Sequence, residues 1–286
     1  MLATIATTEA TGDQLWMRIM APPACGKSTL CEALSVNKEH IVAKSTMRGF
    51  HSGFGVGGED HSLISQLAGK TLIIKDGDAL LTQPNLPVIL AEGRDVYDTV
   101  SRTSYRTSAS RDYEGLRLTW LLCGTDSLRS LDNSELGERF LNCIMIKKIE
   151  EELENKILWA VAEKANKGMG VKSDAETGVQ SSPETEAAMR KTGGFVNWVR
   201  YRAISAMEDI QLSKAEMEFI INCALLIAFL RARPSERQNE TASREMATRL
   251  TSQLIRLING LCVITNRAPF EAVSYTHLTL PTIYSV

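Results

Sequence analysis

The stretch "RIMAPPACGKSTLCEAL", residues 18–34, decides the fold. An apolar strand runs into the turn Gly26-Lys27-Ser28, and a helical pattern follows. This is the order of a phosphate-binding loop, G-x-x-x-x-G-K-[ST], although Ala21 occupies the place of the first glycine. The second glycine matters most, because backbone N–H groups must curl around a phosphate without a Cβ in the way. The stretch therefore predicts a nucleotide-binding loop between a strand and a helix.

Each part of this loop has an expected contact. Lys27 is expected to reach the β- and γ-phosphate oxygens of ATP, and Ser28 to place its hydroxyl on Mg²⁺. The following helix directs its positive end at the anion. The predicted ATP-binding residues are Ala24, Cys25, Gly26, Lys27, Ser28 and Thr29. A chance Gly-Lys-Ser at the start of a helix is the alternative interpretation.

Apolar runs of strand length alternate with helical or glycine-rich segments through the first half of the chain. These runs are residues 15–20, 40–44, 71–75 and 116–124. The alternation predicts an α/β fold of the P-loop type, with a parallel sheet between two layers of helices. We expect a nucleotide-binding core over residues 1–149 and a C-terminal helical lid over residues 150–272. Within the lid, polar residues 166–194 are expected to form a mobile loop.

Composition narrows the class of protein. The chain has 286 residues, of which 44% are apolar, and its formal net charge of −2 excludes a uniformly basic DNA-coating protein. Its six cysteines form no CxxC pair, which argues against a zinc site and favours reduced thiols in the cytoplasm. The longest apolar run, residues 219–230, is too short to cross a bilayer and predicts a buried helix. Residues 273–286 resemble a translated sequencing adapter, and we expect no folded structure from them.

An acidic motif follows the third apolar run. Nucleoside triphosphatases hold the Mg²⁺ shell with a carboxylate on a neighbouring strand, and "TLIIKDGDAL" offers Asp76, with Asp78 two residues on. Gly77 stands where a water-activating glutamate usually follows the aspartate. Asp76 is therefore the predicted metal-supporting residue and Asp78 the nearest replacement for the glutamate. The alternative is a strand that ends in a solvated Asp-Gly turn.

A polar residue, Thr125, follows the fourth apolar run. Its hydroxyl could bond the γ-phosphate or the attacking water, or it could cap the next helix.

Two segments carry a family resemblance. The first, "SLRSLDNSELGERFLNCIMI" (residues 127–146), resembles the part of AAA+ ATPases that runs from sensor 1 to the arginine finger. The resemblance implies Thr125 as the sensor-1 residue and Arg139 as the finger that reaches the nucleotide of a neighbouring subunit. The second, "TRLTSQLIRLINGLCVI" (residues 248–264), is similar to the sensor-2 helix of minichromosome-maintenance-type helicases and implies Arg249 as its arginine. The ordinary alternatives are surface arginines.

The segment "TVSRTSYRTSASR", residues 99–111, has three arginines, a tyrosine and no acid. We expect a loop here that contacts DNA phosphates through Arg102, Arg106 and Arg111, with Tyr105 stacked on a base. AAA+ helicases place substrate-engaging loops in the same interval. An ordinary solvated loop is the alternative.

Together, the resemblance implies an ATP-hydrolysing AAA+ motor that uses ATP and Mg²⁺, assembles as a ring of identical subunits and acts on DNA. Phage-encoded replication ATPases share this layout, which implies a viral or microbial origin, and no membrane association is expected. Three alternatives stay open. They are an AAA+ remodeller or loader of proteins, a small P-loop kinase for a metabolite or nucleoside, and a nucleotide-gated binding module without useful hydrolysis. The kinase would need an arginine acting within one chain, but no ring.

Overall fold

The computed structural model describes residues 1–52, 60–104, 110–131, 139–145, 183–231 and 247–269, and four helical residue pairs between 155 and 166. The strands are β1 (Trp16–Met20), β2 (Ile41–Lys44), β3 (Thr71–Ile74), β4 (Val100–Ser104), β5 (Ser110–Glu114), β6 (Thr119–Gly124) and β7 (Phe140–Ile144). The helices are α1 (Leu2–Ala6), α2 (Lys27–Ser35), α3 (Gly77–Leu81), α4 (Leu86–Tyr97), α7 (Pro183–Asp209), α8 (Lys214–Arg231) and α9 (Thr248–Thr265), with short 3₁₀ helices η1 (Ile64–Gln66) and η2 (Asp126–Ser130).

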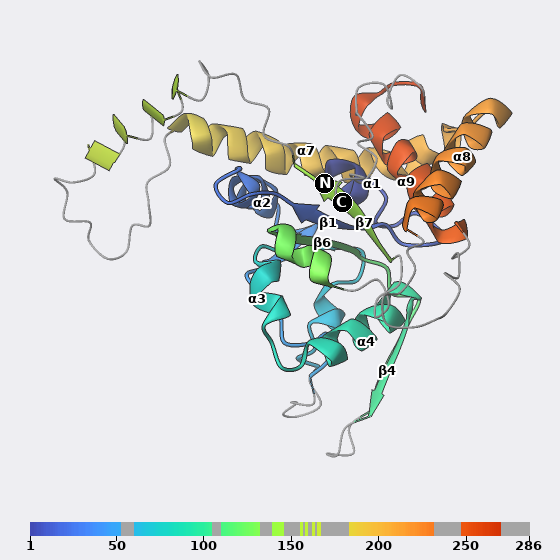
Figure 1. Ribbon diagram of the computed structural model, residues 1–286, viewed down its shortest axis with the longest axis horizontal. Coiled ribbons are helices and arrows are strands. Elements are labelled where there is room, and N and C mark those ends of the chain that lie inside the picture. The colour runs from blue at the N-terminus through green and yellow to red at the C-terminus, as the bar shows by residue number, and fades with distance from the viewer. Residues whose placement is uncertain are drawn as a thin grey trace.

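Five strands form one sheet, and every neighbouring pair in it is parallel. Their order is β2-β3-β6-β1-β7, so β1 lies between β6 and β7. Helices cover both faces of the sheet (Figure 1). The predicted α/β fold with a parallel sheet is therefore confirmed.

Alternating side chains of each strand pack on opposite faces of the sheet, as the period of two requires. From β1, Met17 and Ile19 contribute to a core under α1, α2, α7, α8 and α9. Trp16 and Met20 contribute to the other core, under η1, α3, α4 and η2. In this second core, Trp16 and Trp120 meet edge to face with their ring centroids 5.2 Å apart.

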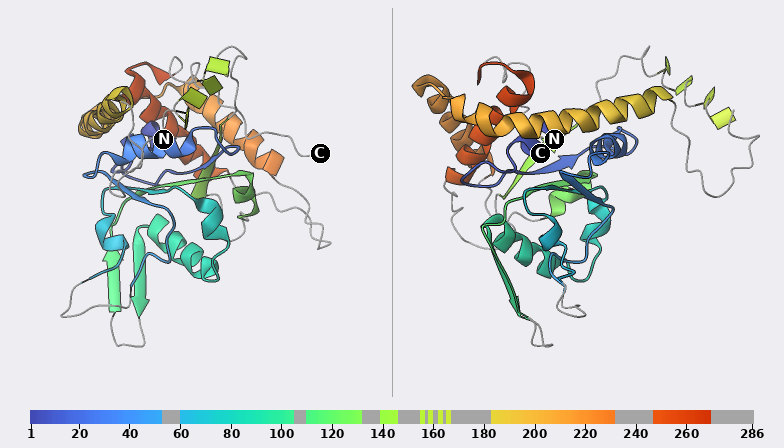
Figure 2. Two further views of the ribbon diagram at one scale, coloured as in Figure 1. Left: turned by 90° about the vertical axis from the view of Figure 1, so that its left-hand side faces the viewer. Right: turned by 180° about the vertical axis from the view of Figure 1, so that it is seen from behind.

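The helices that follow β7 form one of these layers. Ala224 of α8 and Leu250 of α9 belong to the same buried cluster as Ile19 of β1 and Leu121 of β6. The long helix α7 crosses the same side of the molecule (Figure 2). Within the described residues, the segment expected as a helical lid thus covers a face of the sheet, because the apolar side chains there need a larger cover than α2 alone provides.

Two sequence predictions in this region were wrong. Residues 183–194, expected as part of a mobile loop, are the first turns of α7, which begins with Pro183 and carries Glu184 and Glu186 in its first turn. Proline at the first position and acids near the N-terminus both favour the start of a helix. The apolar run 219–230 is helical but not fully buried, since Phe219 is 48% and Phe229 65% exposed.

The segment expected as a loop over residues 99–111 contains β4 and the first two residues of β5. β4 and β5 pair antiparallel, with Ser101 opposite Tyr113, and the hairpin projects away from the sheet (Figures 1 and 2). Val100, Thr103 and Tyr113 belong to residue types that favour strands, and this propensity outweighs the loop-like polarity of the segment.

Gly260 of α9 provides a test of the packing between the first helix and the last. A Cβ at this position would lie 2.3 Å from the carbonyl oxygen of Ala3 in α1. Gly260→Ala should therefore lower the free energy of unfolding, measured in urea, by about 1–3 kcal/mol. Gly194→Ala in α7 is the matched control, because a Cβ there meets no described atom within 4 Å. The control should be neutral or stabilising by up to about 1 kcal/mol, and equal losses in both variants would contradict the packing.

Candidate functional site

The order of the strands reverses between β1 and β6. The chain leaves β1 toward β2 on one side, whereas it leaves β6 toward β7 on the other. In open parallel sheets, ligands bind outside the carboxyl ends of the strands at such a point. Two segments border this crevice, residues 21–26 after β1 and Thr125 after β6, and the Ala21 N–H donates to the Gly124 carbonyl at 3.2 Å. The topology therefore places the predicted phosphate loop at a favourable position for a ligand.

The loop after β1 contains two left-handed residues, Ala24 with φ of 60° and Gly26 with φ of 81°. Gly26 adopts this conformation without cost and is the N-cap of α2, whereas Ala24 is strained by its Cβ. Turns of this kind can direct backbone N–H groups toward a shared centre. Ala21, at the position of the missing glycine, is 3% exposed. The loop thus closes with an alanine methyl buried where the pattern has a glycine.

Lys27 folds back over the loop. Its Nζ donates to the carbonyl oxygens of Ala21 at 2.6 Å and Pro22 at 3.0 Å. An ammonium has three N–H donors, so an incoming phosphate oxygen can take the third or replace a carbonyl. Ser28 and Thr29 are exposed in the first turn of α2, where their backbone N–H groups face no earlier helical turn.

The two aspartates after β3 have different surroundings. Asp76 is exposed and caps α3, accepting a bond from the Ala79 N–H at 3.0 Å. Asp78, one residue into that helix, accepts from the Thr125 N–H at 2.9 Å and the Thr125 hydroxyl at 3.1 Å. The Ser127 hydroxyl donates to the same carboxylate. Asp78 therefore joins the end of β6 to α3, while Asp76 lies at the same edge without this bridge.

Two glycines allow Asp78 to come so close to β6. A Cβ on Gly77 would lie 2.9 Å from side-chain carbons of both Leu122 and Leu128, and one on Gly124 would lie 3.1 Å from Asp78 Oδ1. A glutamate directly after Asp76 would have no room. The packing of α3 on β6 thus gives a physical reason for Gly77, and it leaves Asp78 as the carboxylate beside Thr125.

The pKa of the Asp78 carboxyl lies below its ordinary value. Burial raises this pKa, but the hydrogen bonds from Ser127 and Thr125 outweigh burial, and the charge of Lys27 lowers the pKa further. Asp78 is therefore ionised at neutral pH and is a weak base. The hydrogen bond between Ala21 and Gly124 places the predicted phosphate loop beside the end of β6, which Asp78 joins to α3.

Two residues of this region were missed by the sequence analysis. Arg18, in the middle of β1, is 6% exposed and donates to the carbonyls of Leu131 at 3.0 Å and Leu128 at 3.2 Å. It thereby fixes η2, which carries Ser127. A single charged residue inside an apolar strand was the available signal for Arg18, whereas nothing in the sequence distinguishes Ser127 from other serines near Thr125.

The two arginines implied by the family resemblance lie at the other end of the sheet. Arg139 precedes β7, at the amino ends of the strands, and pairs with Asp98 at 2.8 Å. Its Cζ lies 5.5 Å from the centroid of the Tyr97 ring, and the Cζ of Arg249 lies 5.8 Å from the same centroid. Neither arginine contacts the phosphate loop of its own chain, but the fold brings the two together around one tyrosine.

The predicted DNA contacts are only partly described. Arg102 is exposed on β4 and forms an ion pair with Glu114 of β5. Arg111 is a residue of β5 whose side chain is not described, and Tyr105 and Arg106 lie outside the described residues. The tail, residues 273–286, also lies outside them.

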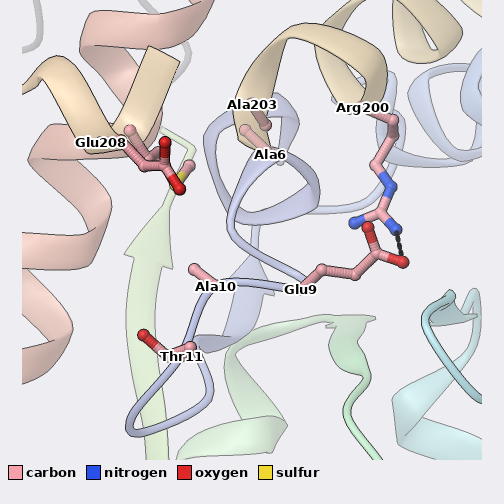
Figure 3. A pocket seen from close by; sticks show the side chains of 8 residues that line it. Ala6, Glu9, Ala10, Thr11, Arg200, Ala203 and Glu208 are labelled. Atoms are coloured by element: carbon pink, nitrogen blue, oxygen red, sulfur yellow. Dashed lines mark ion pairs between the residues drawn. The ribbon is translucent and has the colours of Figure 1, made fainter. Parts of the chain in front are cut away.

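A separate cavity of about 350 Å³ opens between the α1–β1 connection and α7 (Figure 3). Glu9 and Arg200 line it as an ion pair of 3.1 Å, and Arg200 also donates to the Gly69 carbonyl at 2.8 Å. These contacts hold α7 against the amino ends of the strands. None of the residues that line the cavity is a predicted site residue. In the described part of the chain, no cluster of three His, Cys, Asp or Glu side chains is placed to hold a metal ion. None of the helices described is both long and apolar enough to cross a membrane.

Comparison with known proteins adds no assignment. No protein-family model matches the sequence, and a search of curated proteins found no similar sequence.

The lowered pKa of Asp78 makes stability depend on pH in a defined direction. A depressed pKa means that the carboxylate bonds to Thr125 and Ser127 stabilise the fold above the ordinary aspartate pKa, about 3.9, and are lost as the pH falls through the lower folded value. Wild-type protein should therefore lose more stability than Asp78→Asn as the pH falls below about 4, measured by urea unfolding. Asp95→Asn, on an exposed position of α4, is the control and should follow the wild-type pH profile. Parallel profiles for wild type and Asp78→Asn would contradict the assignment.

Proposed function

We propose that this chain binds ATP in the crevice between β1 and β6 and hydrolyses it as an AAA+-type ATPase. One observation carries the proposal. The loop that bears Lys27 and the bridge between Asp78 and Thr125 meet at the carboxyl edge of the sheet, at the point where the strand order reverses. A cation over a glycine-containing turn at a helix N-terminus suits polyphosphate, and a polar strand end beside it suits a terminal phosphate.

The proposed contacts follow from the positions of the side chains. The N–H groups of residues 24–29 and the Lys27 ammonium would hold the phosphates. The oxygen donors Ser28 and Asp76 are of the type that Mg²⁺ prefers, and when bound the ion would neutralise phosphate charge. The Thr125 hydroxyl donates its one proton to Asp78, so it would orient the attacking water by accepting a hydrogen bond from it, and it would donate to a γ-phosphate oxygen only after turning away from Asp78.

We further propose a ring of identical subunits. The five residues of β1 span about 16 Å, so Arg139 and Arg249 at the amino edge are far from the phosphate loop of their own chain. Any contact of theirs with nucleotide must therefore be with another chain. The same separation argues against Arg139 and Arg249 as the arginine that the kinase alternative needs within one chain.

DNA is the proposed polymer, contacted by the β4–β5 hairpin. The hairpin projects from the sheet and carries Arg102 on an exposed strand. Arg102→Ala should weaken binding of single-stranded DNA and reduce its salt dependence, because one phosphate contact is lost. Glu114→Gln breaks the same ion pair but keeps the arginine, and it should not weaken binding. Equal weakening in both variants, or no binding by wild type, would argue against DNA.

A nucleotide-gated binding module without useful hydrolysis is the second candidate. It is favoured by the state of Asp78, whose carboxylate accepts bonds from Thr125 and Ser127 and whose pKa is low, so that it is a poor general base. The six cysteines are free thiols, which supports a reducing compartment such as the cytoplasm for either candidate.

Lys27→Ala tests nucleotide binding. The substitution removes the charge that would meet the β- and γ-phosphates, so ATP hydrolysis should fall more than tenfold and the affinity for a fluorescent ATP analogue should fall with it. Lys38→Ala, on the exposed turn after α2, is the matched control and should keep both. Unchanged affinity in Lys27→Ala would end the nucleotide proposal, whereas wild-type binding without turnover would favour the binding module.

Two variants separate the proposed role of Arg139 in a neighbouring subunit's site from its role in the ion pair with Asp98. Arg139→Ala and Asp98→Ala both remove the 2.8 Å ion pair, but only Arg139→Ala removes the guanidinium. If Arg139 completes the site of a neighbouring subunit, Arg139→Ala should lower ATP hydrolysis by about 10³-fold with nucleotide affinity nearly intact, and Asp98→Ala should retain most activity. Mixed Arg139→Ala and Lys27→Ala chains should regain part of the activity. Equal losses in the two single variants, or no recovery in chains shown to co-assemble, would contradict the ring.

A further inference from the structure

Two cysteines lie against each other beneath the candidate nucleotide site. The Sγ atoms of Cys31 and Cys123 are 3.4 Å apart, and each residue is 1% exposed. Cys31 is on α2 and Cys123 on β6, so the contact joins two elements 92 residues apart in the sequence. Within the described residues, no other two cysteine sulfurs are in contact.

The two cysteines lie close in sequence to residues of the candidate nucleotide site. Cys31 lies one helical turn after Lys27, and Cys123 lies two residues before Thr125. A covalent bond between the two sulfurs would therefore connect α2, the helix after the predicted phosphate loop, directly to β6, the strand that ends before Thr125.

The two thiols are not equivalent. The hydrogen bond from Cys123 lowers the pKa of the Cys31 thiol, against the effect of burial, and the charges of Lys75 and Lys27 lower it further. The pKa of Cys123 is raised by the same bond and by burial. Cys31 is therefore the sulfur that ionises first, and the thiolate is the reactive form of cysteine.

We propose that Cys31 and Cys123 are a dithiol oxidation site, which hydrogen peroxide converts to a disulfide. The Cys31 thiolate attacks one peroxide oxygen, the O–O bond breaks, and the departing hydroxide takes up a proton to become water. The resulting Cys31 sulfenic acid is attacked by the Cys123 sulfur, the S–O bond breaks, and a second water leaves with the remaining proton. Two electrons pass from the sulfurs to the peroxide, and thiol reductants reverse the change.

The disulfide would disturb the site because the sulfurs must approach. A disulfide bond is about 2.05 Å long, so the two sulfurs would have to approach by roughly 1.4 Å, through rotation of the side chains together with movement of α2 against β6. Misplacement on this scale is sufficient to impair a phosphate site. We infer that oxidation lowers ATP affinity and hydrolysis by tenfold or more, and this inference rests on the proposed function. In a reducing compartment such a bond is transient, as in redox-sensing proteins.

Peptide mapping tests the modification without reference to nucleotide. The full chain is treated with graded hydrogen peroxide, its free thiols are blocked with N-ethylmaleimide, and it is digested without reductant. A cross-linked peptide pair containing Cys31 and Cys123, lighter by two hydrogen atoms, is expected at peroxide doses that leave Cys223 alkylated. Cys31→Ser should abolish the cross-link, and Cys223→Ser on α8 should retain it. Oxidation of Cys25 alone, with Cys31 and Cys123 both alkylated, would overturn the proposal.

Binding of a fluorescent ATP analogue tests the consequence. Affinity should fall in proportion to the cross-linked fraction in wild type and Cys223→Ser, return on addition of dithiothreitol, and not respond to peroxide in Cys31→Ser. A complete cross-link with unchanged affinity would overturn the inferred effect on the site. If the reduced wild-type chain binds no nucleotide at all, the proposed function fails, and the mapping result still decides whether the dithiol is an oxidation site.

Discussion

The site depends on the pairing of β6 with two parallel neighbours at once. Leu121 is the partner of Met17 in β1 and of Ile73 in β3, so all three strands end at the same edge of the sheet. The predicted phosphate loop, Thr125 and the acidic motif therefore emerge side by side, although they come from distant parts of the sequence. A shift of one residue in this register would turn the core side chains of a strand to the opposite face. The hydrophobic core thus specifies the geometry of the candidate site.

Close packing of α3 against β6 also determines the geometry of the candidate site. Gly77 and Gly124 allow α3 to lie against β6, and Asp78 then accepts hydrogen bonds from Thr125. Arg18, buried within β1, fixes the following turn through the carbonyls of Leu128 and Leu131. The polar residues at the carboxyl ends of the strands are therefore held by the buried Arg18 and by hydrogen bonds, as well as by the pairing of the strands. The same arrangement places Cys31 and Cys123 in contact below it.

Much of the fold follows from the sequence because its signals are local. Strand-length apolar runs and the Gly-Lys-Ser turn predict the parallel sheet and the position of the loop, and Asp76 and Thr125 emerge at that edge as expected. Long-range contacts could not be predicted. Neither the ion pair of Arg139 with Asp98 nor the approach of Arg249 to Tyr97 has a local pattern.

Other differences have similar causes. The hairpin over residues 99–111 was predicted as a loop because hydroxyl residues suit both loops and strands. The C-terminal helices were predicted as a lid, but their periodicity does not show which surface they cover. The role of Gly77 depends on the distance between α3 and β6, which only the packed structure supplies.

A crystal structure of the chain with Mg²⁺ and a non-hydrolysable ATP analogue tests the central claim most directly. The account predicts that the β-phosphate lies at the N-terminus of α2, within hydrogen-bond distance of Lys27 Nζ, and that the γ-phosphate faces Thr125. Lys27 should then have left at least one of its two carbonyl partners, on Ala21 and Pro22. A nucleotide bound elsewhere, or a crevice that stays empty at saturating analogue with Lys27 still on both carbonyls, would contradict the account.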